Sequence, residues 1–196
     1  MRLLQCAVYS AHWGRLQRKQ ENLRYILDGH ALVGISELHC GAAVADSILF
    51  QHHPTHQPFY HCGENLSGQA ILACRKWAHG FGIGDISTEG LTWGSEVMVN
   101  GAFHVLWWID GDIVRGFINM YLSSHGADQR AKQMSDAATW VRGFKERVRA
   151  WEARDNIQYT CEWVYGGDRN FTMSPEQRFT SSATNTWYPG SKSKGK

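Results

Sequence analysis

The sequence lacks the cysteine pattern of a disulfide-stabilised domain or of a zinc ribbon. Its cysteines are odd in number and widely spaced, and no two of them form a C-x-x-C pair. The five are Cys6, Cys40, Cys62, Cys74 and Cys161. Thiols without an evident disulfide framework are typical of reducing compartments. We therefore expect an intracellular location, with the nucleus as one candidate compartment.

Three further features are absent from the sequence, and each absence argues against a class of protein. The N-terminal residues contain no long apolar segment followed by a cleavage site, so no signal peptide is expected. No stretch of roughly 18 apolar residues exists. We therefore expect neither a transmembrane helix nor a membrane partner. The sequence G-x-x-x-x-G-K-[ST] does not occur either. A Walker-type phosphate loop is therefore not expected.

An excess of charge of one sign is also missing. The formal net charge is only +2, which by itself is too small to indicate a nucleic-acid partner. Hydrophobic residues make up 43% of the chain and charged residues 19%, a balance typical of a folded globular protein. We expect one domain over residues 1–180. The remaining residues, 181–196, form a Ser/Gly/Lys-rich tail with too few aliphatic side chains to pack, and we expect this tail to be disordered.

The first forty residues have the pattern of a βαβ unit. An apolar run over 2–9 predicts a strand. Over 15–30 an amphipathic helix is predicted from the spacing of three to four residues between Leu16, Gln20, Leu23 and Leu27. The continuous apolar run over 31–39 predicts a buried strand. Glu37 lies at the end of that run.

The rest of the chain combines strands with one long helix. Residues 41–68, which are rich in His and Pro, predict an irregular loop. Residues 69–76 predict a strand, and two β-rich runs within 101–122, divided by an Asp-Gly pair, predict a hairpin. A helix over 128–155 and a last strand over 158–168 follow. This order predicts an α/β layered domain.

The predicted helix over 128–155 has an apolar face and a basic face. Its apolar stripe consists of Met134, Ala138, Val141, Phe144, Val148 and Trp151. Its basic positions are Lys132, Arg142, Lys145, Arg149 and Arg154. A DNA contact is one interpretation of the basic face. The interpretation we favour is a solvated exterior, which is the usual role of a charge-rich helix face.

Polar residues that could carry chemistry stand at the ends of three predicted strands. Glu37 and Tyr121 end the first two, and Asp168 and Asn170 close the last. Residues two apart in an extended segment project to the same side, so Asp168 and Asn170 would point together. Taken alone, that segment favours an Asx-type turn, and Glu37 taken alone is better explained as a surface carboxylate. Taken together, the four residues favour a site.

The same segments resemble the motifs of the endonuclease/exonuclease/phosphatase superfamily, which includes abasic-site and retrotransposon endonucleases. LVGISELH resembles the strand that ends in the family's metal-binding glutamate, and GQAILACRK resembles the strand that follows it. FINMYLSS resembles the strand with a phosphate-contacting tyrosine, and YGGDRNFT resembles the Gly-Asp-x-Asn-Phe motif. The resemblance runs from residue 2 to about residue 180. It implies a layered α/β/β/α sandwich.

The resemblance also implies a Mg²⁺-dependent phosphodiester hydrolase that cleaves nucleic acid, with DNA as the expected substrate. Glu37 would coordinate the divalent cation, normally Mg²⁺ and alternatively Mn²⁺. Asp168 would orient or deprotonate the attacking water, and Asn170 would hold that water or a phosphate oxygen. Tyr121 would contact the scissile phosphate. In such a reaction the cation stabilises charge on the phosphoryl oxygens.

The chain departs from the family pattern in four places. Ala11 stands where the family has an asparagine, Ala31 where it has an aspartate, and Arg169 where it has an apolar residue. The family's later catalytic aspartate and terminal Ser-Asp-His have no counterpart before Lys196, so we expect an incomplete fold with an unpaired sheet edge. Two alternatives stay open. One is a non-catalytic remnant that binds nucleic acid or protein, and the other is a phosphatase of the same superfamily.

A zinc site is the weaker interpretation of the histidine-rich loop. Its candidate ligands are His52, His53, His56, His61 and Cys62. The H-x-x-x-H spacing from His52 to His56 lies in a Pro-containing segment outside any predicted helix, so it fits no zinc template. A nucleophilic pair of Cys40 with His39 lacks a supporting signature, because adjacent residues on a strand point apart.

Overall fold

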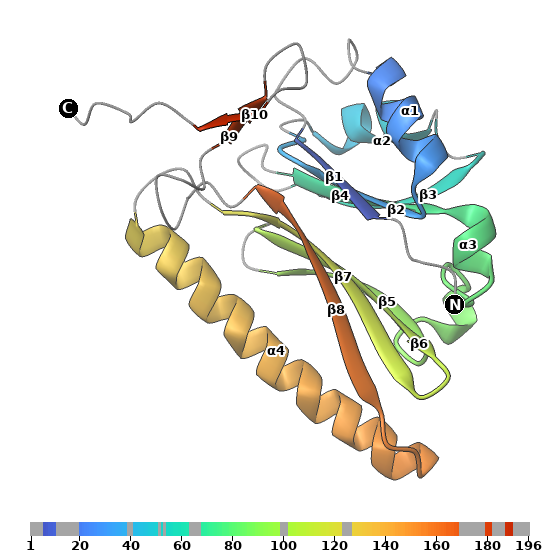
Figure 1. Cartoon of the computed structure of the whole chain (residues 1–196). Coiled ribbons are helices and arrows are strands. Elements are labelled where there is room, and N and C mark those ends of the chain that lie inside the picture. The colour runs from blue at the N-terminus through green and yellow to red at the C-terminus, as the bar shows by residue number, and fades with distance from the viewer. Residues whose placement is uncertain are drawn as a thin grey trace.

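A computed structural model of the chain describes residues 6–10, 20–38, 41–50, 52, 54–62, 68–98, 102–122, 127–168, 179–181 and 187–189. These residues form two four-stranded sheets that pack face to face, with helices on both outer faces (Figure 1). Two short strands, β9 (Phe179–Ser181) and β10 (Trp187–Pro189), pair with each other in antiparallel orientation. Of the predicted tail, 181–196, the structure describes Ser181 and Trp187–Pro189.

The first sheet has the strand order β1-β2-β4-β3. Its strands are β1 (Cys6–Ser10), β2 (Leu32–Ser36), β3 (His56–Cys62) and β4 (Gly68–Cys74). Strand β1 is parallel to β2, and β4 is antiparallel to both of its neighbours. All five residues of β2 are buried, as expected for the continuous apolar run from which it was predicted.

The second sheet has the order β5-β6-β7-β8. Its strands are β5 (Trp93–Met98), β6 (Phe103–Asp110), β7 (Ile113–Tyr121) and β8 (Thr160–Asp168). The first three form an antiparallel meander, whereas β8 is parallel to β7. A parallel neighbour needs a long crossover connection. Helix α4 (Ala127–Asp155) makes that connection.

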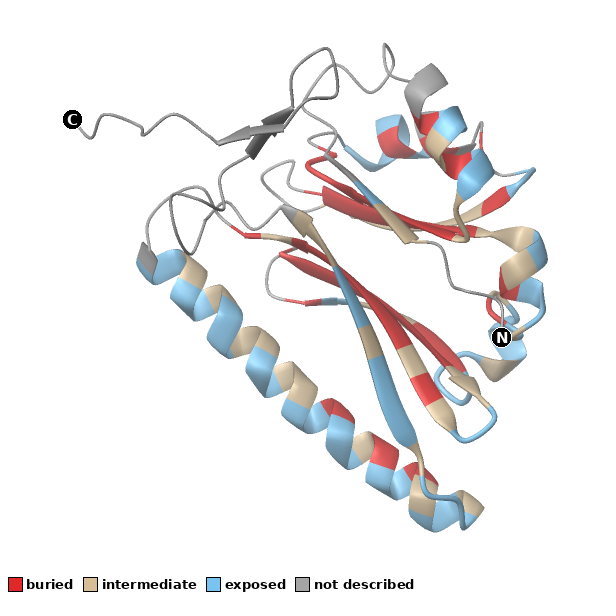
Figure 2. Ribbon diagram, viewed as in Figure 1, coloured by how far each residue is buried: buried red, intermediate tan, exposed pale blue. Residues whose placement is uncertain are grey.

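Helices cover the outer faces of both sheets. Helices α1 (Gln20–Gly29) and α2 (Ala42–Phe50) lie on the first sheet, α4 lies on the second, and the short helix α3 (Arg75–His79) follows β4 (Figure 1). Buried residues are concentrated in the central strands and on the inward sides of the helices (Figure 2). The predicted α/β/β/α sandwich is therefore confirmed.

The core between the sheets is aromatic at one end. Its buried members are Leu32, Ile71, Ala73, Ala78, Ile83, Trp93, Leu106, Trp108 and Phe117. The rings of Trp77 and Trp108 meet edge to face with centroids 5.0 Å apart, a favourable arrangement for aromatic pairs. Through these contacts α3 and the start of β2 pack against the second sheet.

Most predicted elements are confirmed within the described residues. The strand ending at Glu37, the strand over 69–76, the hairpin, the long helix and the last strand correspond to β2, β4, β6–β7, α4 and β8. The four described cysteines are free thiols. None of the described helices is long and apolar enough to cross a membrane.

The prediction of an irregular loop over 41–68 was wrong. Helix α2 and strand β3 occupy most of it. Pro58 lies inside β3, which argues against a central strand. Strand β3 is an edge strand that pairs only with β4, so a missing backbone N–H on its open side is tolerated.

The apolar stripe predicted along α4 is confirmed only toward the C-terminal end of the helix. Phe144, Val148 and Trp151 are buried, but Met134 is 48% exposed and Ala138 is also exposed. The N-terminal half of α4 is largely solvent-accessible in Figure 2. Of the predicted basic face, Lys132 forms a 2.9 Å ion pair with Asp136 on the helix surface. An exposed pair of this kind is consistent with a solvated exterior.

A carboxylate between α4 and the second sheet accepts hydrogen bonds from both. Glu96 of β5 accepts from Trp107 Nε1 at 3.0 Å and from Trp140 Nε1 at 2.9 Å. Arg147 of α4 donates to both carboxylate oxygens, at 2.8 and 3.1 Å. Burial raises the pKa of Glu96, but these hydrogen bonds more than offset it, so the pKa lies below its ordinary value.

We expect Glu96→Gln to lower the free energy of unfolding by about 1–3 kcal/mol at pH 7, because glutamine cannot form the paired hydrogen bonds to Arg147. A depressed folded-state pKa stabilises the fold above the unfolded pKa of roughly 4.3. That contribution is lost as the pH falls through the lower folded value. Urea unfolding at a series of pH values checks this, and the difference between wild type and variant should shrink with falling pH.

The matched control is Glu162→Gln, which removes the 2.7 Å pair of a more exposed carboxylate with Arg115. We expect this control to change the free energy of unfolding by about 0.5 kcal/mol or less. Equal losses in the two variants, or a Glu96→Gln loss that does not change with pH, would contradict the assigned role.

Candidate active site

The two sheets approach each other closely where glycines of one sheet face side chains of the other. A Cβ atom on Gly34 of β2 would lie 2.6 Å from Asn119 Oδ1 of β7, and one on Gly166 of β8 would lie 2.1 Å from Val8 Cγ2 of β1. Val8 is paired with Gly34, and Asn119 with Gly166. Each sheet therefore inserts a side chain over a glycine of the other. We call these four residues the sheet interlock.

A hydrogen bond reinforces the interlock. The side chain of Asn119 is fully buried. Its Nδ2 donates to the carbonyl oxygen of Ile35 at 2.9 Å and to that of Ala70 at 3.4 Å. Leaving a buried amide without partners costs about 1–3 kcal/mol, so β7 is held at one position along β2 and β4.

This position brings four strand ends to one end of the sandwich. Leu32, at the start of β2, shares a cluster with Trp108 of β6. The carbonyl of Ile35, near its end, accepts from Asn119 Nδ2 of β7, and the register partner of Asn119 is His104, near the start of β6. Because β6 is antiparallel to β7, β2 and β7 run in the same direction. Strands β1 and β8 are parallel to them, so all four carboxyl ends lie together (Figure 1).

Glu37 follows β2 at this end. Its side chain is only 8% exposed, and its backbone φ is +59°. A non-glycine residue in this region costs about 1–3 kcal/mol and persists only where the surroundings impose it, often at functional sites. The next residue, Leu38, donates its N–H to the carbonyl of Gly68 at 3.0 Å. The predicted position of Glu37 at the end of a buried strand is confirmed.

The backbones of Tyr121 and Asp168 lie side by side at two strand ends. Tyr121 is the last residue of β7, and its register partner Asp168 is the last residue of β8. Tyr121 is half-buried, and its N–H donates to the carbonyl of Ala102 at 2.8 Å. The segment up to Asp168 is therefore a strand end and not a turn. Asn170, together with Arg169, lies outside the described residues.

Polar side chains fill the interior beneath these strand ends. They are Ser36, Gln69, His104 and Asn119, and all are buried. Ser95 Oγ lies 2.8 Å from His104 Nε2. Burial, and to a smaller extent the charge of His61, lowers the pKa of His104 to about 3. His104 is therefore a neutral hydrogen-bonding group at physiological pH and adds no charge to the site.

These interior residues were not among the candidates taken from the sequence. The sequence does contain a signal for Asn119. Phe117, Asn119 and Tyr121 alternate along β7 and so share one face of the sheet. Since that face is buried between the sheets, an asparagine in this alternation must find a polar partner inside the protein. The partner, the backbone of β2 and β4, is not visible in the local sequence.

The oxygen atoms at this end suit a hard divalent cation. Besides the Glu37 carboxylate, they include Ser36 Oγ, a buried atom with no hydrogen-bond partner within the described part of the chain. Asn119 Oδ1 also lacks a partner there, but it lies against Gly34 between the sheets. Mg²⁺ prefers oxygen ligands and is commonly held by one or two carboxylates together with water. No group of three His, Cys, Asp or Glu side chains converges within the described ranges. A cation here would therefore rely on Glu37 and on neutral oxygen donors.

The histidine-rich segment lies outside the helices, as predicted, because α2 ends at Phe50 and β3 begins at His56. The N–H of His56 donates to the carbonyl of His52 at 2.8 Å and closes a turn. Both side chains are buried, and burial is the largest cause that lowers the pKa of each. His53, His39 and Cys40 lie outside the described residues.

The comparisons with known proteins identify the fold. No protein-family model and no curated sequence matches the chain. Among solved structures, D. rerio TDP2 humanised by 14 mutations is 11% identical, with a TM-score of 0.51 over 85% of this chain and 66% of that one. The human Nocturnin catalytic domain with bound sulfate is 10% identical, with a TM-score of 0.48 over 81% of this chain and 59% of that one. A truncated Caenorhabditis elegans TDP2 is 12% identical, with a TM-score of 0.44 over 82% of this chain and 58% of that one.

These proteins are members of the endonuclease/exonuclease/phosphatase superfamily. The likeness to the D. rerio protein shows that the described residues have this superfamily's fold. This chain spans between 58% and 66% of the length of the three solved structures. The fold predicted from the motif resemblance is confirmed.

We expect Gly34→Ala to destabilise the protein by about 1–3 kcal/mol, because the new methyl group collides with Asn119 and displaces its hydrogen bond. The control is Gly143→Ala in α4, where a Cβ atom meets nothing within 4 Å. Removing a mid-helix glycine should stabilise by about 0.5–1 kcal/mol. Urea unfolding measures both. Effects of the same sign in the two variants would show that the interlock does not constrain the sheets.

Proposed function

We propose that the ends of β2, β7 and β8 form a Mg²⁺-dependent site that hydrolyses phosphodiester bonds of nucleic acid, with DNA as the substrate. The observation that supports this proposal is the sheet interlock, which places Glu37 and the register pair Tyr121–Asp168 at the same end of the sandwich. Strand ends of an α/β scaffold are suited to catalysis because rigid elements hold the side chains in place.

Glu37 would hold the cation through its carboxylate, and Mn²⁺ could replace Mg²⁺. When bound, the cation supplies stabilisation of the negative charge that develops on the phosphoryl oxygens. The strained backbone of Glu37 supports this role, since strain is retained where a side chain must be held in one direction. Neutral His104 beneath the site adds no positive charge that would compete with a cation.

The other residues would act on the water and the substrate. Asp168 would orient the attacking water or accept its proton, a role suited to a carboxylate near the reacting atoms. Asn170 would hold that water or a phosphate oxygen. Tyr121 would donate a hydrogen bond from its hydroxyl to the scissile phosphate. Residues 1–180 would form the corresponding domain, with 181–196 as a polar tail.

We expect nicking of supercoiled plasmid DNA by this chain in the presence of Mg²⁺. Glu37→Gln and Asp168→Asn should each reduce the rate by roughly 10²–10⁴-fold, the range typical of a lost acid/base or charge-stabilising group. The amides keep the size of the side chains while removing their charge. Gel separation of nicked from supercoiled plasmid measures the rates.

The matched control is Asp112→Asn. Asp112 is exposed in the β6–β7 turn, at the other end of the second sheet, and its replacement should leave nicking unchanged. Equal background in wild type and all variants would overturn the hydrolase proposal. If the wild type then still retards labelled DNA in a gel, the alternative of a non-catalytic, nucleic-acid-binding remnant is supported. Release of phosphate from a phosphorylated lipid or metabolite would support the phosphatase alternative.

A further inference from the structure

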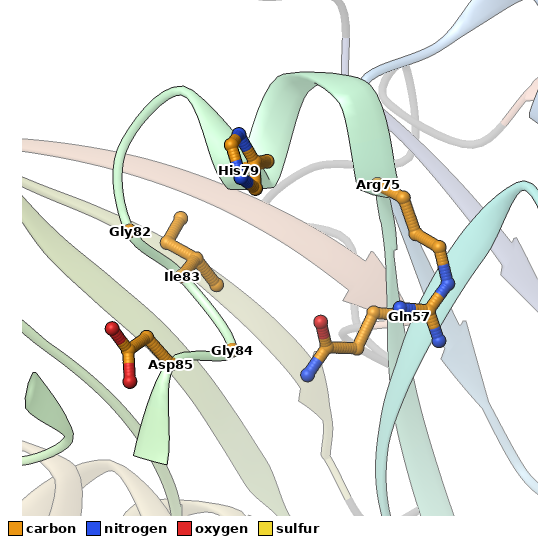
Figure 3. A pocket seen from close by; sticks show the side chains of 7 residues that line it. All are labelled: Gln57, Arg75, His79, Gly82, Ile83, Gly84 and Asp85. Atoms are coloured by element: carbon orange, nitrogen blue, oxygen red, sulfur yellow. The ribbon is translucent and has the colours of Figure 1, made fainter. Parts of the chain in front are cut away.

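A polar cavity lies far from the strand ends that carry Glu37. It has a volume of about 620 Å³ and opens between β3, α3 and the loop after α3 (Figure 3). Gln57, at the start of β3, is paired with Ala73, and Ala73 is paired with Leu32, the first residue of β2. The cavity is therefore at the opposite end of the first sheet from Glu37. Its volume is within the range of about 300–1,000 Å³ typical of small-molecule sites.

Several polar groups in the cavity have hydrogen-bonding capacity to spare. Within the described part of the chain, the carboxamide of Gln57, the imidazole of His79 and the N–H of Gly84 take part in no hydrogen bond. Gly84 has a φ of +97°, and a Cβ atom there would lie 2.3 Å from Gln57 Oε1. Only glycine therefore allows the carboxamide to lie against the loop backbone. A ligand in the cavity would meet both donors and acceptors.

The charges of the cavity are separated between its walls. Arg75 and His79 come from α3 and are four residues apart, so they share one side of the helix. Asp85 comes from the loop on the other side of the cavity (Figure 3). Its Oδ1 accepts from the Ser87 side chain at 2.7 Å and from the Ser87 N–H at 2.9 Å. The Ser87 side-chain bond, followed by the backbone bond, lowers the pKa of Asp85. One wall therefore attracts anions, and the other accepts hydrogen bonds.

We propose that this cavity binds a phosphorylated small molecule that also carries hydroxyl groups, of the class of nucleoside monophosphates. Its phosphate would lie against Arg75 and His79, because guanidinium and imidazole groups donate to phosphate oxygens. Its sugar hydroxyls would donate to Asp85, and the Gln57 carboxamide would contact the polar groups between them. The site lies beyond the proposed hydrolase function and does not depend on it.

Titration calorimetry of the full chain in EDTA, which removes divalent cations from the Glu37 end, tests this site. Adenosine monophosphate should bind, and Arg75→Gln should weaken binding at least tenfold. Glu37→Gln should leave it unchanged. His79→Gln provides a second test if Arg75→Gln fails to fold. Arg142→Gln is the matched control, because Arg142 is an exposed arginine on α4 whose NH2 bonds only to Thr139 Oγ1 among the described residues.

Asp85→Asn gives a sharper readout because its effect should change sign between ligands. The asparagine retains an oxygen for Ser87 but replaces the free carboxylate oxygen with an N–H donor. Inorganic phosphate should therefore bind more tightly, since a repelling charge is removed. Adenosine monophosphate should bind less tightly, since its hydroxyls lose their acceptor. The same direction of change for both ligands would overturn the proposed orientation.

A terminal phosphate on a nucleic-acid strand offers the same chemistry as a free nucleotide. A tetranucleotide with a 5′-phosphate distinguishes the two sources. Binding of the tetranucleotide that Arg75→Gln weakens assigns the cavity to strand ends as well as to free nucleotides, whereas binding of the mononucleotide alone assigns it to free nucleotides. No binding of either, equal binding by wild type and Arg75→Gln, or loss of binding in Glu37→Gln would overturn the proposal.

Discussion

The buried amide of Asn119 fixes how the two sheets pack against each other. An amide enclosed between two sheets must have partners, and it finds them in the backbone of Ile35 and Ala70. That contact is sterically allowed only because residue 34 is glycine. The sheets therefore cannot slide along each other without breaking a hydrogen bond or creating a collision. Glu37 is two residues beyond Ile35 and Tyr121 is two residues beyond Asn119, so the same contact sets the relation between the candidate catalytic residues.

The sandwich has two chemically different ends. At one end, aromatic rings such as Trp77 and Trp108 fill the space between the sheets, and apolar burial of this kind provides most of the stability of a domain. At the other end the interior is polar, and the backbone of Glu37 is strained. Polar burial and strain reduce stability, and natural proteins retain them mainly where function requires them. This contrast supports the polar end as the site of chemistry.

Local patterns in the sequence were sufficient to predict the strands that end at Glu37, Tyr121 and Asp168, because apolar runs and turn residues act over a few positions. They were not sufficient for β3, since Pro58 is tolerated there only because an edge strand leaves one side open. The partnership of Asn119 with Gly34 was also invisible, because it joins residues far apart in the chain. The polar cavity was not predictable from local patterns either, because it depends on how α3 lies against β3.

Paramagnetic broadening of backbone amide signals by Mn²⁺ tests the central claim most directly, because it locates a divalent cation without requiring activity. In a titration followed by ¹H–¹⁵N spectra, we expect the signals of Glu37, Tyr121 and Asp168 to broaden together at the lowest Mn²⁺ ratio. The signals of His52 and His56 should stay sharp at that ratio. Broadening centred on those histidines, or on one strand end without the other two, would show that these strand ends do not share a cation site.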